Sequence, residues 1–153
     1  MSPELHDGGP FVAQASGSTT VASLFVARAR IHPGRVAVED GARRFTYGEL
    51  ATRTRRLAGA LAARGVTRGS RVAILSENRV EYLEVFLAAA RLGAIVACQS
   101  WRLAPRELVH CLELVEPVVT FASPRHVEKL ARAASAEVVT FGDDYERLAT
   151  VSE

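Results

Sequence analysis

The chain has 153 residues, a length that suits a single domain with its own buried core. Hydrophobic residues make up 48% and charged residues 24%, as in ordinary globular proteins. The formal net charge of +2 argues against nucleic acid or an anionic membrane surface as a partner. No apolar run approaches the ~20 residues of a membrane-spanning helix, and the N-terminus lacks the basic start and apolar stretch of a secretory signal. We therefore expect a cytoplasmic protein.

Residues 1–18 are rich in glycine, serine and proline and are predicted to form a flexible leader. The remainder, residues 19–153, is expected to form one α/β domain. It contains the two cysteines, Cys98 and Cys111, which a cytosolic protein keeps as reduced, buried thiols. A disulfide between them is the less favoured alternative.

The first elements predicted in chain order are a helix and a hairpin. Thr20 is a good N-cap for a helix over 20–30, which ends before a His-Pro pair. Strands are predicted over 36–40 and 43–46 on either side of a Gly-Ala connection, a pattern typical of a β-hairpin. The second strand is expected to pass directly into a helix that ends near residue 64, because a threonine and a glutamate have the spacing of a capping box.

Arg53, Arg55 and Arg56 form the densest basic group of the chain and lie on this second helix. Apolar residues recur on the helix with helical period, so the arginines are expected on its solvent-exposed face. A phosphate or nucleic-acid patch is the alternative. It is less favoured, because no aromatic residues alternate with the arginines as single-strand binding requires.

Strands and helices alternate along the rest of the chain. Short apolar strands are predicted over 71–75, 94–98, 117–121 and 137–141, and helices over 78–92, 105–114, 123–134 and from 143 onward. This alternation predicts a mostly parallel sheet with helices on both faces. In the helix over 78–92, Asn78 and Glu81 have capping-box spacing, and the side chains expected to point inward are Val80, Leu83, Phe86, Leu87 and Ala90.

Several short motifs follow one another between residues 20 and 145. They include Thr46-Tyr-Gly-Glu-Leu50, Gly69-Ser-Arg-Val-Ala-Ile-Leu75, Gly93-Ala94 and Trp101-Arg-Leu-Ala-Pro105. In order and spacing they resemble the N-terminal part of the adenylate-forming ligases (the AMP-dependent synthetase/ligase superfamily), and most of all the acyl-CoA and fatty-acid-CoA synthetases. Two positions depart from that family, which usually has proline where Cys98 stands and asparagine where Ser100 stands.

The resemblance implies an enzyme that activates a carboxylate with ATP and Mg²⁺ and then transfers the acyl group to coenzyme A, in fatty acid metabolism. It also implies that the Ser/Thr/Gly-rich phosphate loop ending in lysine, the ribose-binding acid and the catalytic lysine lie beyond these 153 residues. We therefore expect this chain to be an inactive scaffold that contains no catalytic, cofactor-binding or metal-ligating residue and that binds none of these cofactors tightly. The resemblance makes Trp101 and Arg102 candidates for lining the acyl or CoA passage; a loop tryptophan packed over a sheet edge is the plainer interpretation of Trp101.

Other polar residues support no catalytic site. The four histidines lack metal-ligand spacing with any cysteine or acid. His110 and Cys111 are neighbours on a helix, so their side chains diverge by about 100° and are poorly placed as a nucleophile–base pair. Lys129, the only lysine, is expected to be solvated beside Glu128.

The alternative function is a stand-alone, non-catalytic interaction or dimerisation module of the same fold. In either case the expected partner is the remainder of a ligase domain or a second copy of the chain. The reason is that apolar strands without their cover, together with an open sheet edge, favour association. The strands expected to provide this surface are Ala94–Cys98, Val118–Phe121 and Val138–Phe141, with Trp101 nearby.

Overall fold

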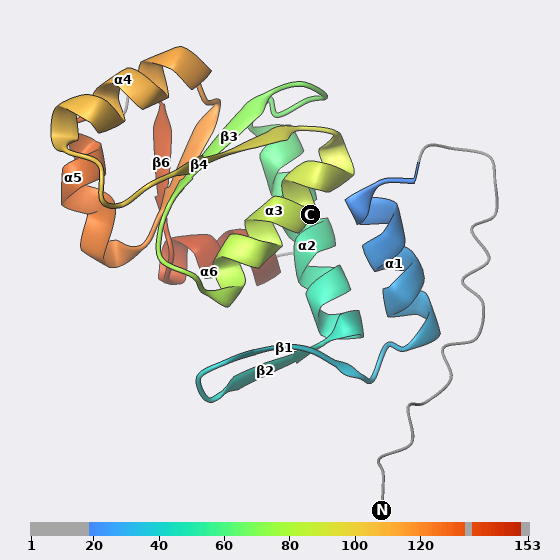
Figure 1. Ribbon diagram of the computed structural model, residues 1–153. Coiled ribbons are helices and arrows are strands. Elements are labelled where there is room, and N and C mark those ends of the chain that lie inside the picture. Colours follow the sequence, from blue (N-terminus) through green and yellow to red (C-terminus); the bar gives the residue numbers. More distant parts are fainter. Residues whose placement is uncertain (1–18, 134–135, 151–153) are drawn as a thin grey trace, which may run out of the picture.

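The computed structural model describes residues 19–133 and 136–150. A four-stranded parallel sheet lies between two layers of helices, and an antiparallel hairpin lies beside the ends of helices in one layer (Figure 1). The predicted α/β class, with a parallel sheet flanked by helices and an N-terminal hairpin, is confirmed. The leader predicted over 1–18 lies outside the described residues. Within the ranges that the structure describes, no helix combines the length and the apolar character needed to cross a bilayer.

The described strands form two separate sheets. Their bounds are β1 Val36–Asp40, β2 Arg43–Thr46, β3 Arg71–Leu75, β4 Ile95–Gln99, β5 Val119–Ala122 and β6 Glu137–Thr140. β1 and β2 form the predicted hairpin, and the other four run parallel in the order β4-β3-β5-β6. Leu75 pairs with Gln99 on one side and with Ala122 on the other, so three neighbouring strands end in register.

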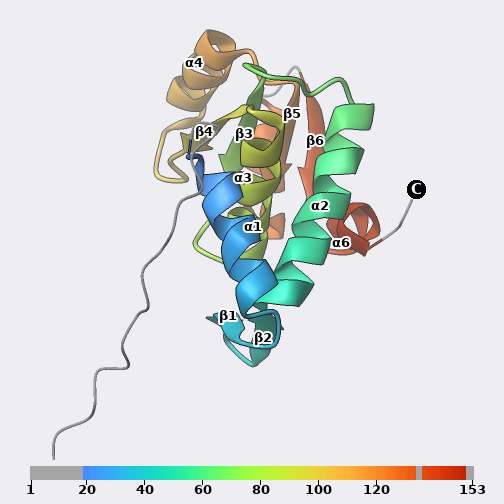
Figure 2. The same ribbon diagram turned by 90° about the vertical axis from the view of Figure 1, so that its right-hand side faces the viewer.

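Helices cover both faces of the parallel sheet. The bounds are α1 Val21–Ile31, α2 Tyr47–Ala63, α3 Val80–Leu92, α4 Pro105–Val115, α5 Val127–Ala131 and α6 Asp143–Thr150, with a 3₁₀ turn, η1, at Pro124–His126. The core residues of α2, α3 and α6 pack on one face of the sheet, and those of α4 and α5 pack on the other. α1 lies outside the first layer, against α2 and α3 (Figure 2).

Two helix starts follow the local signals in the sequence. At α1, Thr20 Oγ1 accepts the Ser23 backbone N–H at 3.1 Å. At α2, Thr46 Oγ1 accepts the Glu49 backbone N–H at 3.2 Å, and the Glu49 carboxylate accepts the Thr46 backbone N–H at 2.8 Å. Gly93 ends α3 in the left-handed region at φ 68°, where a side chain would be strained.

The capping box predicted for Asn78 and Glu81 is wrong. α3 begins at Val80 without a side-chain cap, and Glu81 instead accepts hydrogen bonds from two arginines. The helix predicted over 123–134 is also shorter than expected. It begins as the 3₁₀ turn and continues only as α5, and its predicted end at Ala134 lies outside the described residues.

The inward face of α3 differs most from its prediction. Val80 and Leu87 are buried as expected, but Leu83 and Phe86 are 36% and 39% exposed. Two carboxylates are buried instead, because Glu81 is 3% exposed and Glu84 is 0% exposed. A charged carboxylate is buried only when it is paired, so the partners of these two residues explain the orientation of α3.

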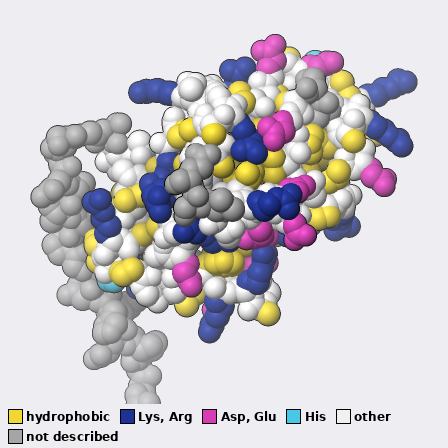
Figure 3. Space-filling model, turned by 180° about the vertical axis from the view of Figure 1, so that it is seen from behind, with side chains coloured by type: hydrophobic (Ala, Val, Ile, Leu, Met, Phe, Trp, Pro, Cys, Tyr) yellow, Lys and Arg dark blue, Asp and Glu magenta, His cyan; other side chains and the backbone are white. Residues whose placement is uncertain are grey.

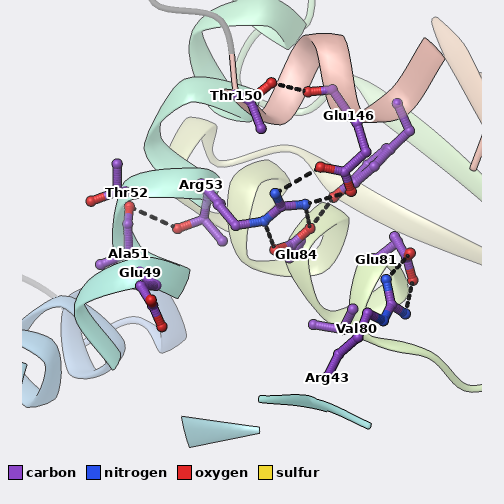
Figure 4. Close-up of polar contacts among 12 residues, drawn as sticks. Arg43, Glu49, Ala51, Thr52, Arg53, Val80, Glu81, Glu84, Glu146 and Thr150 are labelled. Carbon is purple, nitrogen blue, oxygen red and sulfur yellow. Dashed lines mark hydrogen bonds and ion pairs between the residues drawn. The ribbon is translucent and has the colours of Figure 1, made fainter. Parts of the chain in front are cut away.

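Glu84 is paired with Arg53, one of the arginines predicted to be solvated. The two side chains form a double hydrogen bond, with Arg53 Nη2 at 3.0 Å from Glu84 Oε2, and Arg53 Nη1 also donates to Glu146 at 2.8 Å (Figure 4). Tyr145 donates its hydroxyl to Glu84 at 2.6 Å. The prediction of a solvated face is therefore wrong for Arg53 and correct for Arg55, which is exposed. Figure 3, from behind, shows basic and acidic side chains intermixed with apolar ones.

Glu81 joins the hairpin to the start of α3. Arg43 Nη1 and Arg79 Nε each donate to the Glu81 carboxylate at 2.8 Å, and Asp40 accepts the Val80 backbone N–H at 3.2 Å. Burial alone would raise the pKa of Glu81, but the hydrogen bonds from the two arginines outweigh it and lower the pKa to about 2. Glu81 thus stays ionised at neutral pH and holds the hairpin against α3.

The sheet is better covered than the sequence predicts. Val119 and Phe121 on β5 and Val139 on β6 are at most 5% exposed, so the expectation of an uncovered apolar surface is wrong for these interior positions of β5 and β6. On the edge strand β4, Ile95 is 56% exposed. Cys98 on the same strand is exposed and Cys111 is partly buried; both are free thiols, as predicted, but the predicted burial of Cys98 is wrong.

We expect Arg53→Met to destabilise the fold strongly, because it leaves the buried Glu84 carboxylate without its cation. Removing one partner of a buried pair costs about 3–5 kcal/mol. Urea unfolding followed by far-UV circular dichroism measures this loss in the free energy of unfolding. Arg55→Met removes the same charge from an exposed position of the same helix, and its cost should stay within about 0.5 kcal/mol. Equal losses in the two variants would contradict the prediction.

Candidate functional site at the carboxyl edge of the sheet

The strand order creates a switch point between β3 and β5. The chain leaves β3 toward α3 on one face, and it leaves β5 toward α5 on the other. Ligands of open α/β sheets bind at such a point, in the crevice beyond the carboxyl ends of the strands. Because β3, β4 and β5 end in register, the loops that follow them begin side by side. These three loops define the candidate site.

The loops after β3 and β5 are joined through Glu77. Ser123, which is 0% exposed, donates its hydroxyl to Glu77 Oε2 at 2.7 Å, and His126 Nε2 lies 3.5 Å from the same oxygen. Burial tends to raise the pKa of Glu77, yet the Ser123 hydrogen bond and the nearby positive charge lower it overall. Burial also lowers the pKa of His126, against the attraction of Glu77.

These three residues are not arranged as a nucleophile and its base. In a serine nucleophile the hydroxyl donates to the histidine, and a carboxylate orients the far side of that ring. Here the Ser123 hydroxyl donates to the carboxylate, and His126 approaches the same carboxylate oxygen. The cluster therefore fastens two loops together and does not activate the serine.

The loop after β4 presents Trp101 and Arg102. The Trp101 indole stacks on the His126 ring, with centroids 6.0 Å apart and an interplanar angle of 11°. The central guanidinium carbon of Arg102 lies 4.7 Å from the Trp101 ring centroid, a cation–π geometry. Trp101 nevertheless remains 44% exposed, so part of the indole is open to a ligand. Both predicted residues thus lie at the candidate site.

Lys129 also belongs to this site, although its sequence context predicted a solvated side chain. Its ammonium donates to the Trp101 carbonyl at 2.9 Å and to the Leu103 carbonyl. Every residue has a backbone carbonyl, so a sequence pattern does not show which carbonyls accept hydrogen bonds from a side chain. These two lie 28 and 26 positions away from Lys129 along the chain. The one available signal was that this is the only lysine among 153 residues.

A hollow of about 430 Å³ lies away from this edge, between β2 and the first half of α2. It is lined by Arg44, Phe45, Gly48, Glu49, Thr52, Arg53 and Arg56. Arg44 pairs with Glu39 and Arg53 pairs with two glutamates, whereas Arg56 Nε is buried without a hydrogen-bond partner among the described residues. In the parts of the chain that the structure describes, no three His, Cys, Asp or Glu side chains are grouped to hold a metal ion. The carboxyl edge is the stronger candidate site.

Comparison with known proteins agrees with this fold. A family model described as AMP-binding enzyme matches residues 25–152. A feruloyl-CoA synthase of Amycolatopsis is 39% identical over 114 residues, which are 74% of this chain and 23% of that protein. The chain therefore spans about a quarter of the length of the curated relatives that it matches.

Solved structures share the architecture. A fatty acyl CoA synthetase of Mycobacterium tuberculosis superposes with a TM-score of 0.79 at 26% identity, over 87% of this chain and 28% of that one. A benzoate CoA ligase of Burkholderia xenovorans gives a TM-score of 0.82 over 88% of this chain and 29% of that one. Its identity of 24% makes this second likeness one of fold alone.

We expect Ser123→Ala to raise the pKa of the Glu77 carboxyl. The substitution removes the hydrogen bond that lowers this pKa, whereas burial, which raises it, remains. In the native chain the lowered pKa means that Glu77 stabilises the fold above its unfolded-state pKa, and this contribution is lost as pH falls toward the folded-state pKa. The substitution should therefore reduce the contribution of Glu77 to the pH dependence of the free energy of unfolding in acid. Carboxyl carbon shifts in an NMR titration measure the pKa, and Ser70→Ala, which alters a partly exposed serine at the opposite end of β3, is the control. An unchanged Glu77 titration in Ser123→Ala would contradict the assignment.

Proposed function

Because this chain belongs to the AMP-binding enzyme family, we propose that it is the N-terminal portion of an ATP-dependent ligase of the acyl-CoA synthetase type. In this proposal the whole ligase joins a carboxylate to ATP with Mg²⁺, which gives an acyl-adenylate and pyrophosphate. It then transfers the acyl group to the thiol of coenzyme A. The observation that carries the proposal is the family match over residues 25–152, together with relatives named as CoA ligases.

Within such a ligase, this portion serves as a scaffold that does not perform the chemistry alone. A Ser/Thr/Gly-rich loop ending in lysine, which could hold the phosphates of ATP, is absent from the 153 residues. The single lysine, Lys129, is engaged with backbone carbonyls. We therefore infer that the isolated chain lacks adenylating activity and binds ATP, Mg²⁺ and CoA weakly.

Trp101 and Arg102 are the residues that we assign to the acyl or CoA passage. Three observations support this assignment: their place at the carboxyl edge of the sheet, the 44% exposure of Trp101, and the guanidinium of Arg102 beside the indole. An aromatic face suits the apolar part of an acyl or pantetheine chain, and a guanidinium suits phosphate oxygens.

We further propose a cytoplasmic enzyme of fatty acid metabolism. The two free thiols support the location, and the fatty acyl CoA synthetase likeness supports the metabolic role.

The test of this function uses the isolated chain and a chimera. Pyrophosphate exchange with ATP, Mg²⁺ and a panel of aromatic and fatty carboxylates should stay at background for the isolated chain. A chimera that carries residues 19–150 in place of the matching segment of the Mycobacterium tuberculosis fatty acyl CoA synthetase should form acyl-CoA. In this chimera, Arg102→Ala should raise the KM for CoA about tenfold, the equivalent of about 1.4 kcal/mol. Arg106→Ala, an exposed arginine on α4, is the matched control. Sustained turnover by the isolated chain would overturn the scaffold role.

The exposed edge of β4 favours a second candidate function, a non-catalytic dimerisation module. β4 is one of the two edge strands of the sheet, and Ile95 on it is 56% exposed. An open strand edge can pair with a second copy, and a specific dimer buries about 800 Å² per partner. We propose that the isolated chain associates through this edge.

Sedimentation equilibrium tests this proposal. The native chain should give a dimer or a larger species at micromolar concentration, and Ile95→Lys should give a monomer, because an edge lysine disfavours strand pairing. Val36→Lys alters a comparably exposed residue on the separate hairpin and should leave the association unchanged. A monomeric native chain at that concentration would rule out self-association through β4.

A further inference from the structure

The loop between β4 and α4 is attached at two points to the segment formed by η1 and α5. Lys129 donates to the Trp101 and Leu103 carbonyls, and the Trp101 ring stacks on His126. His126 and Lys129 are three positions apart, at the junction of η1 and α5. One short segment therefore holds both the backbone and the side chain of the tryptophan.

The contacts within the loop are weaker. The Leu103 backbone N–H donates to the Ser100 carbonyl at 3.2 Å, and the Arg102 backbone N–H donates to the Ser100 hydroxyl at 3.3 Å. These bonds shape the turn but do not attach it to the rest of the molecule. The Leu103 side chain packs against the core beneath α4 and α5, and the polar attachment comes from the Lys129 ammonium, which has three donors and can bond both carbonyls at once.

We propose that Lys129 is a positioning residue of the candidate site, holding the 100–104 loop against α5 so that the Trp101 indole and the Arg102 guanidinium form one wall of the passage. The proposal rests on the proposed function for the role of that passage; the attachment of the loop is independent of it. Lys129 touches no reacting group in this scheme and acts only through the loop. Its removal should release the loop and expose the indole.

The experiment uses Trp101 as a reporter, because it is the only tryptophan of the chain. In Lys129→Met, which keeps an unbranched apolar stem but has no donor, the Trp101 emission should shift to the red and acrylamide should quench it more strongly. Arg132→Met removes a positive charge from an exposed position just after α5, and it should leave both readings as in the native chain. Native readings in a folded Lys129→Met protein would overturn the proposal.

The stacking of Trp101 on His126 provides a second measurement, the pH dependence of the Trp101 fluorescence. A loss of stability alone would not change this pH dependence. A protonated imidazole in contact with an indole quenches its fluorescence, so Trp101 emission in the native chain should titrate with His126. The charged groups around His126 are Glu77, Arg125 and Lys129. This titration should disappear in His126→Gln and lose most of its amplitude in Lys129→Met. A full native amplitude in Lys129→Met would show that the ring stays on His126 without the ammonium, and would also overturn the proposal.

If Lys129→Met does not fold, acetylation of the folded native chain replaces the substitution. Lys129 is the only lysine, so an amine-selective acetylating reagent modifies this side chain and the α-amino group alone. The acetylated chain should show the same red shift, and an unshifted emission would overturn the proposal.

The chimera separates this inference from the proposed function. Lys129→Met should raise its KM for CoA while pyrophosphate exchange is retained, whereas a chimera with native Lys129 that forms no acyl-CoA would refute only the function.

Discussion

The buried carboxylate of Glu84 is the constraint on which the helical layer depends. It lies at 0% exposure on α3, and it is neutralised by Arg53 from α2 and hydrogen-bonded by Tyr145 from α6 (Figure 4). Burial alone lowers the pKa of a guanidinium, but the hydrogen bonds to Glu84 and Glu146 raise the pKa of Arg53 instead. An isolated buried carboxylate costs far more than a paired one. The three helices are therefore bound to one mutual arrangement, and Glu81 adds the hairpin to it.

That arrangement also fixes the candidate site. With α3 held on one face and α5 on the other, the loops after β3 and β5 diverge from a single point of the sheet. Glu77 and Ser123 join these two loops, and Lys129 with His126 brings in the loop after β4. The site is thus made from polar contacts between loops on a rigid sheet. This is expected for α/β folds, in which loops carry the binding residues and the sheet holds those loops in place.

The local signals of the sequence were sufficient for the architecture. Capping residues at Thr20 and Thr46, the Gly41-Ala42 turn and the left-handed Gly93 mark element boundaries, because each acts within a few residues of itself. The alternation of apolar strands and helices correctly implied a parallel sheet covered on both faces. Trp101 and Arg102, identified through the family resemblance, lie at the carboxyl edge, and their role in the acyl or CoA passage stays a proposal.

The errors that bear on the candidate site and on the buried ion pairs concern charged side chains whose partners are remote in the sequence. Arg53 pairs with residues 31 and 93 positions away, and Lys129 bonds carbonyls 28 and 26 positions away. The hydrophobic periodicity of a helix predicts that every such charged residue is exposed to solvent, because it takes account only of the free-energy cost of burying a charge. Whether that cost is offset depends on an opposite charge brought near by the folded chain. The order of strands and helices was therefore decided by local sequence, whereas the identity of the buried ions and of the loop attachments was decided by tertiary packing.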